Sequence, residues 1–295
     1  MHETHDAPKS EAGGLFVLAE HRYGKAEVRV VKVARGPSQH EIWDLKVAVA
    51  LEGDFAAAYY SDDNSRLPAT DTMRNTIYVL AQRHPLDSLE SFGLALGEHF
   101  LGIPSVSAAT ITLSAAPWER IKVDQQPHPH AFLRSAGGQR TARVYAQRNG
   151  ERQVSAGIDD LLVLKTTESG WADFYRDELT TLADTDDRIF ATMITASWDY
   201  ATGTGLDFTA LWHAARDQIL TSFCDHYSPS VQHTLYRMGA AVLAALPPIT
   251  RITLKLPNKH HLAFDLARFG ITSQNEIFHA TSEPYGLIEG TIERR

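Results

Sequence analysis

A short polar stretch, "LPNKHH" at residues 256–261, separates two runs of strand-like sequence near the C-terminal end of the chain. Ile252 and Leu254 alternate with polar residues before it, and Leu262 and Phe264 do so after it, as half-buried strands do. The stretch itself combines an amide, an ammonium group and two imidazoles. These groups can donate hydrogen bonds and transfer protons, so the stretch is a candidate wall of a reactive site. The alternative is a solvated loop, since most strand connections are simply polar.

Four other stretches place hydrogen-bonding side chains at the start of an expected strand or helix. The first turn of a helix has backbone N–H groups without intrahelical partners, so a residue there can bind a ligand. The residues of interest are Lys25 in "RYGKAEVRV", Thr70 and Asp71 in "ATDTMRNT", Arg188 in "TLADTDDRI", and Val231 and Gln232 in "SPSVQHTLY".

Each of these residues also has a purely structural explanation. Thr70 can be the N-cap of a helix, and Lys25 can be a solvated lysine at a strand edge. Arg188 can pair with Asp186 or Asp187, its neighbours in the chain. Taken singly, none of these residues predicts a function.

Two histidines in "PHPHAF", His128 and His130, could offer two metal ligands on one strand face. No carboxylate triplet or cysteine accompanies them, so the sequence does not favour a zinc site. The chain also lacks a glycine-rich phosphate loop, a Gly-x-Ser-x-Gly elbow and a His-Glu-x-x-His motif.

The composition is that of a globular protein of 295 residues, long enough for one large domain or two ordinary ones. The net charge of −8 argues against a general nucleic-acid-binding surface. The single cysteine, Cys224, excludes an internal disulfide. No apolar run approaches the roughly 18 residues of a membrane span, so we expect neither a nucleic acid nor a membrane as partner.

The two ends of the chain bear on its location. Residues 1–20 begin with a polar, acid-containing stretch without the apolar core of a signal peptide, and we expect a disordered extension there. The final residues, "IERR", are not a peroxisomal tripeptide. The sequence therefore favours the cytoplasm.

The rest of the chain repeats one order of elements, two strands, two helices and two more strands. The first ββααββ unit covers residues 21–149, with strand patterns at 27–33, 41–53, 108–123 and 131–148. The second unit covers residues 150–295, with strand patterns at 152–167, 188–200, around "LPNKHH" and at 286–293. This order predicts an α+β fold of tandem antiparallel sheets, each with two helices on one face.

Capping signals predict where the helices begin. Thr70 is the expected N-cap of a helix that continues to residue 83, and Asp87 forms a capping-box-like pair with Glu90. In the second unit, a helix is expected over 207–227, and another begins around Ser228 with a proline at its first position.

Taken in order, these stretches resemble the urate oxidase (uricase) family, whose members need no cofactor. The resemblance runs from about Tyr23 to Glu293 and rests on the spacing of many short motifs. They are "RYGK", "VRVVKV", "ATDT.RNTIY", "PHPHAF", "DLLVLKTT", "RDELTTL", "DRI.AT", "SVQ.T.Y.M", "LPNKHH" and "YGLIEGTI". The resemblance implies the tunnelling fold (T-fold), in which two ββααββ units per subunit close into a barrel on dimerisation and two barrels stack into a homotetramer.

The resemblance also implies active sites at subunit interfaces. Lys25 and Thr70 match a catalytic pair from one subunit, and Thr70 and its neighbour Asp71 are among the substrate-binding residues. The residues that match those of the neighbouring subunit are Arg188, Val231, Gln232, Asn258 and the catalytic His260. At the family's stacking phenylalanine this chain has Trp171, with Phe174 three residues on.

The implied reaction is oxidation of urate by dioxygen and water to 5-hydroxyisourate and hydrogen peroxide, a step of purine degradation. Trp171, or Phe174 as the alternative ring, would stack on the flat substrate, while Arg188 and Gln232 bind its edges and the Val231 N–H adds a fixed donor. An ordinary lysine has a pKa of about 10.4, so a lysine base needs burial or a neighbouring cation to lose its proton.

Proton transfer would involve Lys25, with Thr70 as a relay and His260 orienting the lysine or passing protons onward. Asn258 and Thr70 would hold dioxygen and then water above the substrate ring. Side chains alternate along an extended segment, so Lys259 and His261 are expected to point away.

Two other functions fit parts of the pattern. One is a pterin- or purine-transforming hydrolase of the same fold, but such enzymes use zinc or a glutamate anchor. The other is a non-catalytic purine-binding T-fold protein, which would not need Lys25, Thr70 and His260 together.

Overall fold

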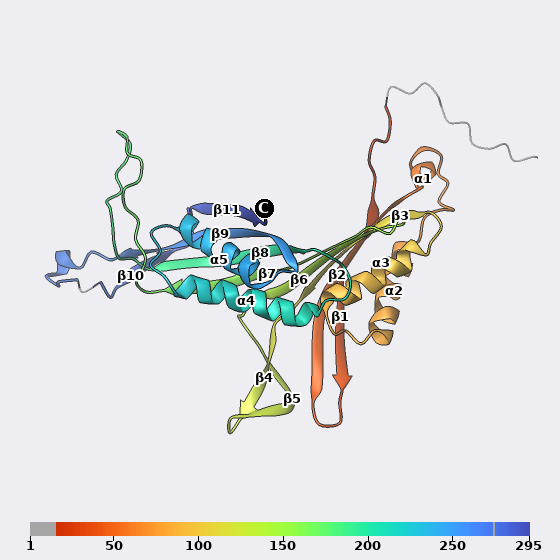
Figure 1. Ribbon diagram of the computed structural model, residues 1–295, viewed down its shortest axis with the longest axis horizontal. Helices are drawn as coiled ribbons and strands as arrows, with labels where there is room; N and C mark the ends of the chain where they lie inside the picture. Colours follow the sequence, from red (N-terminus) through yellow and green to blue (C-terminus); the bar gives the residue numbers. More distant parts are fainter. Residues whose placement is uncertain (1–15, 274) are drawn as a thin grey trace, which may run out of the picture.

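A single antiparallel sheet organises the chain in the computed structural model, which describes residues 16–273 and 275–295 (Figure 1). Within these ranges the sheet has nine strands in the order β1-β2-β3-β6-β7-β8-β9-β10, and β11 also pairs with β9. Their bounds are β1 (Tyr23–Arg35), β2 (His40–Gly53), β3 (Val106–Ala115), β6 (Gln139–Gln147), β7 (Arg152–Lys165), β8 (Phe190–Tyr200), β9 (Ile249–Ala263), β10 (Phe278–Thr281) and β11 (Leu287–Glu293). Of the expected disordered extension, residues 1–15 lie outside the described ranges.

The helices pack against the sheet in pairs. Those of the first half are α1 (Ala56–Tyr60), α2 (Thr70–Arg83) and α3 (Leu89–Leu101), and those of the second half are α4 (Phe208–Cys224), α5 (Val231–Ala245) and a 3-10 turn, η1 (Ala267–Phe269). Helix α2 contacts β1, α3 contacts β3 and β6, and α5 contacts β9 and β11. None of the helices in the described chain is long and apolar enough to cross a membrane.

Residue periodicity explains which faces are buried. Leu45, Val47, Val49 and Leu51 occupy every second position of β2 and are all buried, and Trp43 on the same face is partly buried. The apolar stripes of α4 and α5 are buried as well, with Leu211 partly so, and their buried residues are Phe208, Trp212, Ala215, Ile219 and Phe223, and Val231, Leu235, Met238 and Val242. These side chains and those of the sheet form one continuous hydrophobic core. The predicted α+β class and the two ββααββ orders are confirmed.

The third and fourth strands of the first half differ from the prediction. Each is split in two, and the inner pieces, β4 (Trp118–Val123) and β5 (Gln126–Arg134), form a separate two-stranded hairpin that projects from the sheet (Figure 1). Pro117 breaks the first strand because it has no N–H to donate, and the Gly137-Gly138 pair breaks the second.

Two helix starts also differ from the prediction. Helix α2 begins at Thr70 with Ala69 at its N-cap and no capping side chain, so the Thr70 hydroxyl does not cap the helix. Helix α3 is capped by Ser88, whose hydroxyl accepts from the Ser91 N–H at 3.0 Å, and not by Asp87. The shift leaves Glu90 free for another role.

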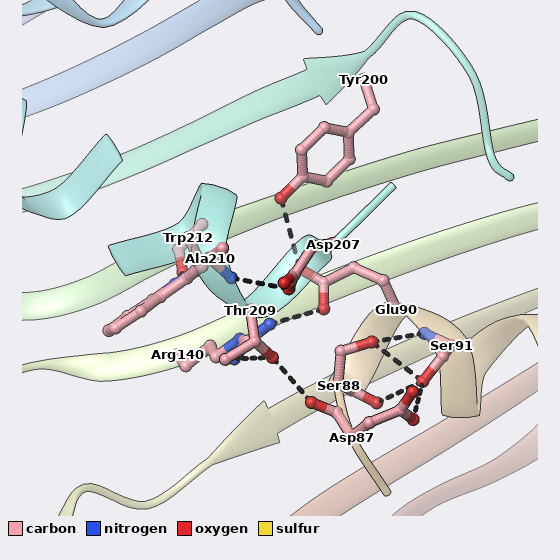
Figure 2. A network of polar contacts seen from close by, with 11 residues as sticks. Asp87, Ser88, Glu90, Ser91, Arg140, Tyr200, Asp207, Thr209, Ala210 and Trp212 are labelled. Carbon is pink, nitrogen blue, oxygen red and sulfur yellow. Dashed lines mark hydrogen bonds and ion pairs between the residues drawn. The ribbon is translucent and has the colours of Figure 1, made fainter. Parts of the chain in front are cut away.

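Glu90 belongs to a buried polar network between the halves of the chain (Figure 2). Its side chain is fully buried and lies 2.8 Å from the Arg140 guanidinium, which also donates to Thr209 Oγ1 at 3.2 Å. The Tyr200 hydroxyl is 3.5 Å from the other Glu90 oxygen, and Arg140 lies over the Trp212 ring. Burial raises the pKa of Glu90, and the nearby Arg140 opposes this effect. The pair therefore joins α3 and β6 to β8 and α4.

The stretch "LPNKHH" is not a junction between two strands, because β9 continues through it from Ile249 to Ala263. Pro257 has no N–H to donate to the sheet, and its carbonyl accepts from the fully buried Thr192 hydroxyl at 2.9 Å. The Asn258 N–H donates to Gly286 O at 2.8 Å. The polar stretch is thus held rigidly in the sheet between β8, β10 and β11.

Candidate active site

Lys25 lies near the start of β1, opposite Val49 of β2. Gly24 precedes it where β1 and β2 come so close that a Cβ atom would collide with Val49 O. Just after Lys25 the register slips, and Glu27 takes up the left-handed conformation with φ of 56°. A cavity of about 300 Å³ opens here, and Lys25 is among its lining residues. The bulge and the glycine thus set the backbone position from which the half-buried Lys25 side chain extends.

Tyr23 connects this strand start to helix α2. Its side chain shares a strand face with Lys25, and its hydroxyl donates to Pro68 O at 3.0 Å. Burial, with a smaller effect of Tyr59, raises the pKa of Tyr23 to about 12, so the hydroxyl keeps its proton. Thr70 follows Pro68 by two residues, so the contact ties the start of α2 to the strand that carries Lys25.

Thr70 and Asp71 are exposed at the start of α2. The Thr70 hydroxyl makes no hydrogen bond within the described ranges, whereas Asp71 pairs with Arg74 at 2.6 Å and accepts from Asn75 at 3.1 Å. An uncapped helix start has free N–H groups and a partial positive charge, which suits a polar or anionic ligand.

Arg188 has the features of a ligand-binding residue. It is half-buried just before β8, and its backbone N–H donates to Ser169 O at 2.8 Å. Its Nε is buried without a hydrogen-bond partner, and no carboxylate of the described chain lies within ion-pair distance. Asp186 and Asp187 do not pair with it, contrary to the structural alternative. Burial lowers the pKa of Arg188, with Tyr227 as a smaller opposing influence.

Trp171 is held close to Arg188 through the backbone. Its N–H donates to Thr185 O at 2.7 Å, and the Thr185 N–H donates back at 2.9 Å. Gly170 is required here because a Cβ atom would collide with the Tyr227 hydroxyl. The half-buried indole is therefore fixed at its base.

Phe174 stacks on Trp171, with ring centroids 5.5 Å apart and planes 8° from parallel. The Arg176 guanidinium lies over the Phe174 ring at 4.3 Å. Phe174 thus has two partners on its ring, an indole and a guanidinium, whereas within the described residues Phe174 alone stacks on Trp171. This arrangement favours Trp171 as the ring with one face available for stacking on a ligand.

Helix α5 begins at Val231, two residues after Pro229, the predicted first helical position. Its N-cap is Ser230, which accepts from the His233 N–H at 3.1 Å and leaves the Val231 and Gln232 N–H groups without intrahelical acceptors. The Val231 side chain is buried and the Gln232 side chain is exposed. The first turn can therefore donate backbone hydrogen bonds outward, with an amide side chain beside them.

Asn258 and His260 share one face of β9, with Asn258 Nδ2 3.4 Å from His260 Nδ1. Lys259 points elsewhere, over the Tyr285 ring at 5.7 Å, and His261 contacts the Lys259 carbonyl at 3.0 Å. The predicted alternation of these side chains is confirmed.

The backbone brings the second-half residues together. Gly170 donates to Ser228 O at 2.9 Å, so the segment with Trp171 and Arg188 lies against the approach to α5. Strand β8, which follows Arg188, pairs with β9 at Thr192 and Asn258. Lys25, Thr70 and Asp71 are not part of this group, because they lie at the β1 edge of the sheet. One chain thus contains two separate halves of the predicted site.

Sequence reasoning missed the residues that support these positions. Thr192, which holds Pro257, and Thr234 looked like ordinary polar residues, and Ser228 looked only like a helix start. The role of Thr192 follows from a contact 65 positions away, and that of Ser228 and Thr234 from the burial of their hydroxyls, which no local pattern signals.

His128 and His130 lie on the β5 hairpin, with ring centroids 4.6 Å apart, and His40 is 5.9 Å from His130. In the described part of the chain, no group of three or more His, Cys, Asp or Glu side chains is arranged to hold a metal ion.

Comparison with known proteins agrees with this geometry. The family model described as Uricase matches residues 21–145 and 154–289. Uricase of Arthrobacter globiformis is 43% identical over 287 residues, which are 97% of this chain and 93% of that protein. Uricase of Dictyostelium discoideum is 40% identical over 284 residues, 95% of this chain and 98% of that protein.

The crystal structure of the Arthrobacter globiformis uricase superposes with a TM-score of 0.89, and the match covers 95% of each chain. The similarity includes both halves of the sheet and both groups of predicted site residues. The chain therefore belongs to the uricase family.

Proposed function

We propose that this protein is a urate oxidase, an oxidoreductase that converts urate, dioxygen and water into 5-hydroxyisourate and hydrogen peroxide. Family membership over nearly the full chain supports this activity. The observation that carries the substrate assignment is the buried Nε of Arg188, which has no partner in the described chain, on a segment whose backbone is paired with the segment that carries Trp171. A planar cation next to a flat ring suits a flat, anionic heterocycle with carbonyl oxygens at its edge.

The other second-half residues complete the binding of urate in this proposal. The free N–H groups of Val231 and Gln232, together with the Gln232 side chain, offer both donors and an acceptor to an amide edge. Trp171 stacks on the heterocycle. Asn258 faces the space above the ring and holds dioxygen and later water.

Lys25 acts as the base, with Thr70 relaying the proton and His260 orienting or relaying in turn. A second deprotonation makes urate a better electron donor, so dioxygen can take electrons from the substrate itself. Water then adds at the oxidised carbon, and the two-electron reduction of dioxygen gives hydrogen peroxide. The proposed reaction needs no metal and no cofactor.

The active site forms between two chains in this proposal. Lys25, Thr70 and Asp71 lie at the β1 edge, far from the β9 group, and a second copy can bring the missing half. Two ββααββ units, residues 21–149 and 150–295, would close with a partner into a barrel, and two barrels would form a homotetramer. Closure would also cover the exposed edges of the sheet. The predicted cytoplasmic location remains a proposal, to be tested by fractionation.

The deciding experiment mixes chelator-treated, metal-analysed protein with urate in air. We expect loss of urate absorbance with one equivalent of peroxide formed per urate. Binding of urate without turnover would instead indicate the non-catalytic purine-binding protein. Activity that disappears with the chelator and returns with one particular metal would overturn the cofactor-free mechanism.

A further inference from the structure

Two buried hydroxyl groups, those of Ser228 and Thr234, lie directly behind the start of α5. Both residues are fully buried, and their oxygens are 2.6 Å apart. Neither side chain faces the cavity beside Lys25 or matches a substrate-binding position of the family motif. We infer that this pair is a positioning device that holds the urate-binding groups of the second half in register, an inference that rests on the proposed function.

The hydroxyl pair belongs to a chain of hydrogen bonds with one consistent direction. Ser228 Oγ lies 3.1 Å from Ser230 O, which can only accept, so the Ser228 hydroxyl donates to it. Thr234 must then donate to Ser228, and His226 Nε2, 3.0 Å from Thr234 Oγ1, must carry a proton and donate to Thr234. The chain ends on the carbonyl of the α5 N-cap.

The same segment is tied by its backbone to the other binding groups. The Ser228 N–H donates to Glu168 O at 2.8 Å, and Ser228 O accepts from the Gly170 N–H at 2.9 Å. Ser169, between these two residues, forms a bridge with Ser228 and accepts from the Arg188 N–H at 2.8 Å. One anchored residue thus connects the segments that carry the ring, the guanidinium and the helix start.

The physical reason for a positioning role is the cost of a buried, unpaired polar group. Removing the Thr234 hydroxyl leaves Ser228 and His226 each short of a partner in a buried site. The segment around Ser228 then shifts to find other partners, and it takes Gly170 and the α5 N-terminus with it. A displacement of a fraction of an ångström is enough to weaken several hydrogen bonds to a rigid ligand together.

The effect should fall on binding more than on chemistry. Arg188, Trp171 and the α5 N-terminus contact the ground state and the transition state alike, so their displacement removes uniform binding. Lys25 and Thr70 lie on the other half-site and keep their own supports. The expected signature is a higher KM with a nearly unchanged kcat.

The test compares the wild-type protein with Thr234→Val, which deletes the hydroxyl at nearly constant volume, and with Ser228→Ala. We expect both variants to raise the KM for urate about tenfold, with kcat changed by less than about threefold. The Kd for xanthine, a purine that shares the dioxo edge and is first shown to be unreactive in the assay, should rise by the same factor. Thr234→Ser restores the hydroxyl and should restore both constants.

Ser222→Ala is the matched control, because it deletes another buried hydroxyl, on α4. A rise in KM as large in this control as in Thr234→Val would overturn the inference, and so would an unchanged KM in a folded Thr234→Val protein. If Thr234→Val does not fold, Ser228→Ala and Thr234→Ser decide by the same criteria. Wild-type protein that neither consumes urate nor binds xanthine would instead overturn the proposed function, and the inference with it.

Discussion

Lys25 and Asn258 lie in one sheet but six strand steps apart, on β1 and β9 (Figure 1). At about 4.8 Å per step, the path along the sheet is roughly 29 Å. The register increases the separation, because Lys25 pairs with Val49, which leads through the intervening strands to the start of β9 near Ile249. A small substrate, roughly 10 Å or less across, therefore cannot contact both residues of one chain.

This separation predicts complementation between two inactive proteins. Lys25→Ala and Arg188→Ala should each abolish most activity, because each removes one half of every site. Co-refolded at equal amounts, the two variants should regain a measurable fraction of wild-type activity, since mixed assemblies contain some sites with both residues intact. Mixing without unfolding is the control for subunit exchange. An inactive co-refolded mixture in which mass analysis finds mixed assemblies would contradict the shared site.

Changes at the first half-site should act on the chemical step. Lys25→Met and Thr70→Ala should lower kcat by on the order of 10²–10⁴-fold, the usual contribution of a positioned proton-transfer group. The Kd for xanthine should change little, because the second half-site makes the proposed binding contacts. The measurement is kcat over a range of pH together with xanthine titration. Near-wild-type kcat in either variant across that range would disprove the assigned role.

Replacement of Glu90 should cause a large loss of stability. Glu90→Ala leaves the Arg140 guanidinium buried without its partner, which typically costs about 3–5 kcal/mol. The control is Glu98→Ala, which breaks the Arg152 pair at a carboxylate that is 74% exposed and should cost less than about 1 kcal/mol. Thermal unfolding should show a Tm lower by many degrees for the first variant only. Equal Tm values would show that the buried pair does not hold the halves together.

Titration of the His226 imidazole should make the stability of the protein depend on pH. Burial, assisted by Lys165 and Arg237 and partly offset by Asp225, lowers the pKa of His226 below its ordinary 6.5. Between the lowered pKa and 6.5, the unfolded chain binds a proton that the folded chain does not. The free energy of unfolding should therefore fall as the pH drops through 6.5 towards the folded-state pKa, and should not depend on this group above 6.5.

His226→Gln keeps an Nε donor but cannot titrate, so it isolates this contribution. Urea unfolding of both proteins from pH 8 to pH 5.5 should show a steeper loss of stability for the wild type. Identical slopes would mean that the imidazole does not contribute to the pH dependence.

Local periodicity explains how much of the fold could be predicted. The alternation in β2 and the stripes of α4 and α5 specify a buried face within a few residues, and the structure buries those faces. The helix caps are less certain, because several polar residues compete at each start. At α3, for example, Ser88 takes the position expected for Asp87.

Long-range pairing explains what could not be predicted. The letters of "LPNKHH" suggest a loop, and pairing with β8, β10 and β11, together with the contacts of the Thr192 hydroxyl and the Gly286 carbonyl, makes the segment a strand. Glu90 reads as a surface capping residue, yet its partner Arg140 lies 50 positions away in sequence. Likewise, the separation of the half-sites follows from the order of strands, which a list of motifs does not contain.

Trp171 offers the sharpest test at the binding site, because Phe174 stacks on it and is the alternative ligand-stacking ring. A stacked aromatic side chain contributes roughly 1–3 kcal/mol per heterocycle. Stacking acts on bound urate and on the reacting complex alike, so its loss should change affinity and not kcat. Trp171→Ala should therefore raise KM about tenfold to a hundredfold, and Trp171→Phe should cost little.

Phe174→Ala is the matched variant. Phe174 already carries Arg176 on its ring, so its removal should lower the Tm and raise KM only modestly through the loss of support for the indole. If Phe174 is instead the ring that stacks on urate, the pattern reverses, and Trp171→Ala lowers the Tm while KM stays constant. Measuring KM, kcat and Tm for both alanine variants distinguishes the two arrangements, since each predicts a different variant with impaired binding.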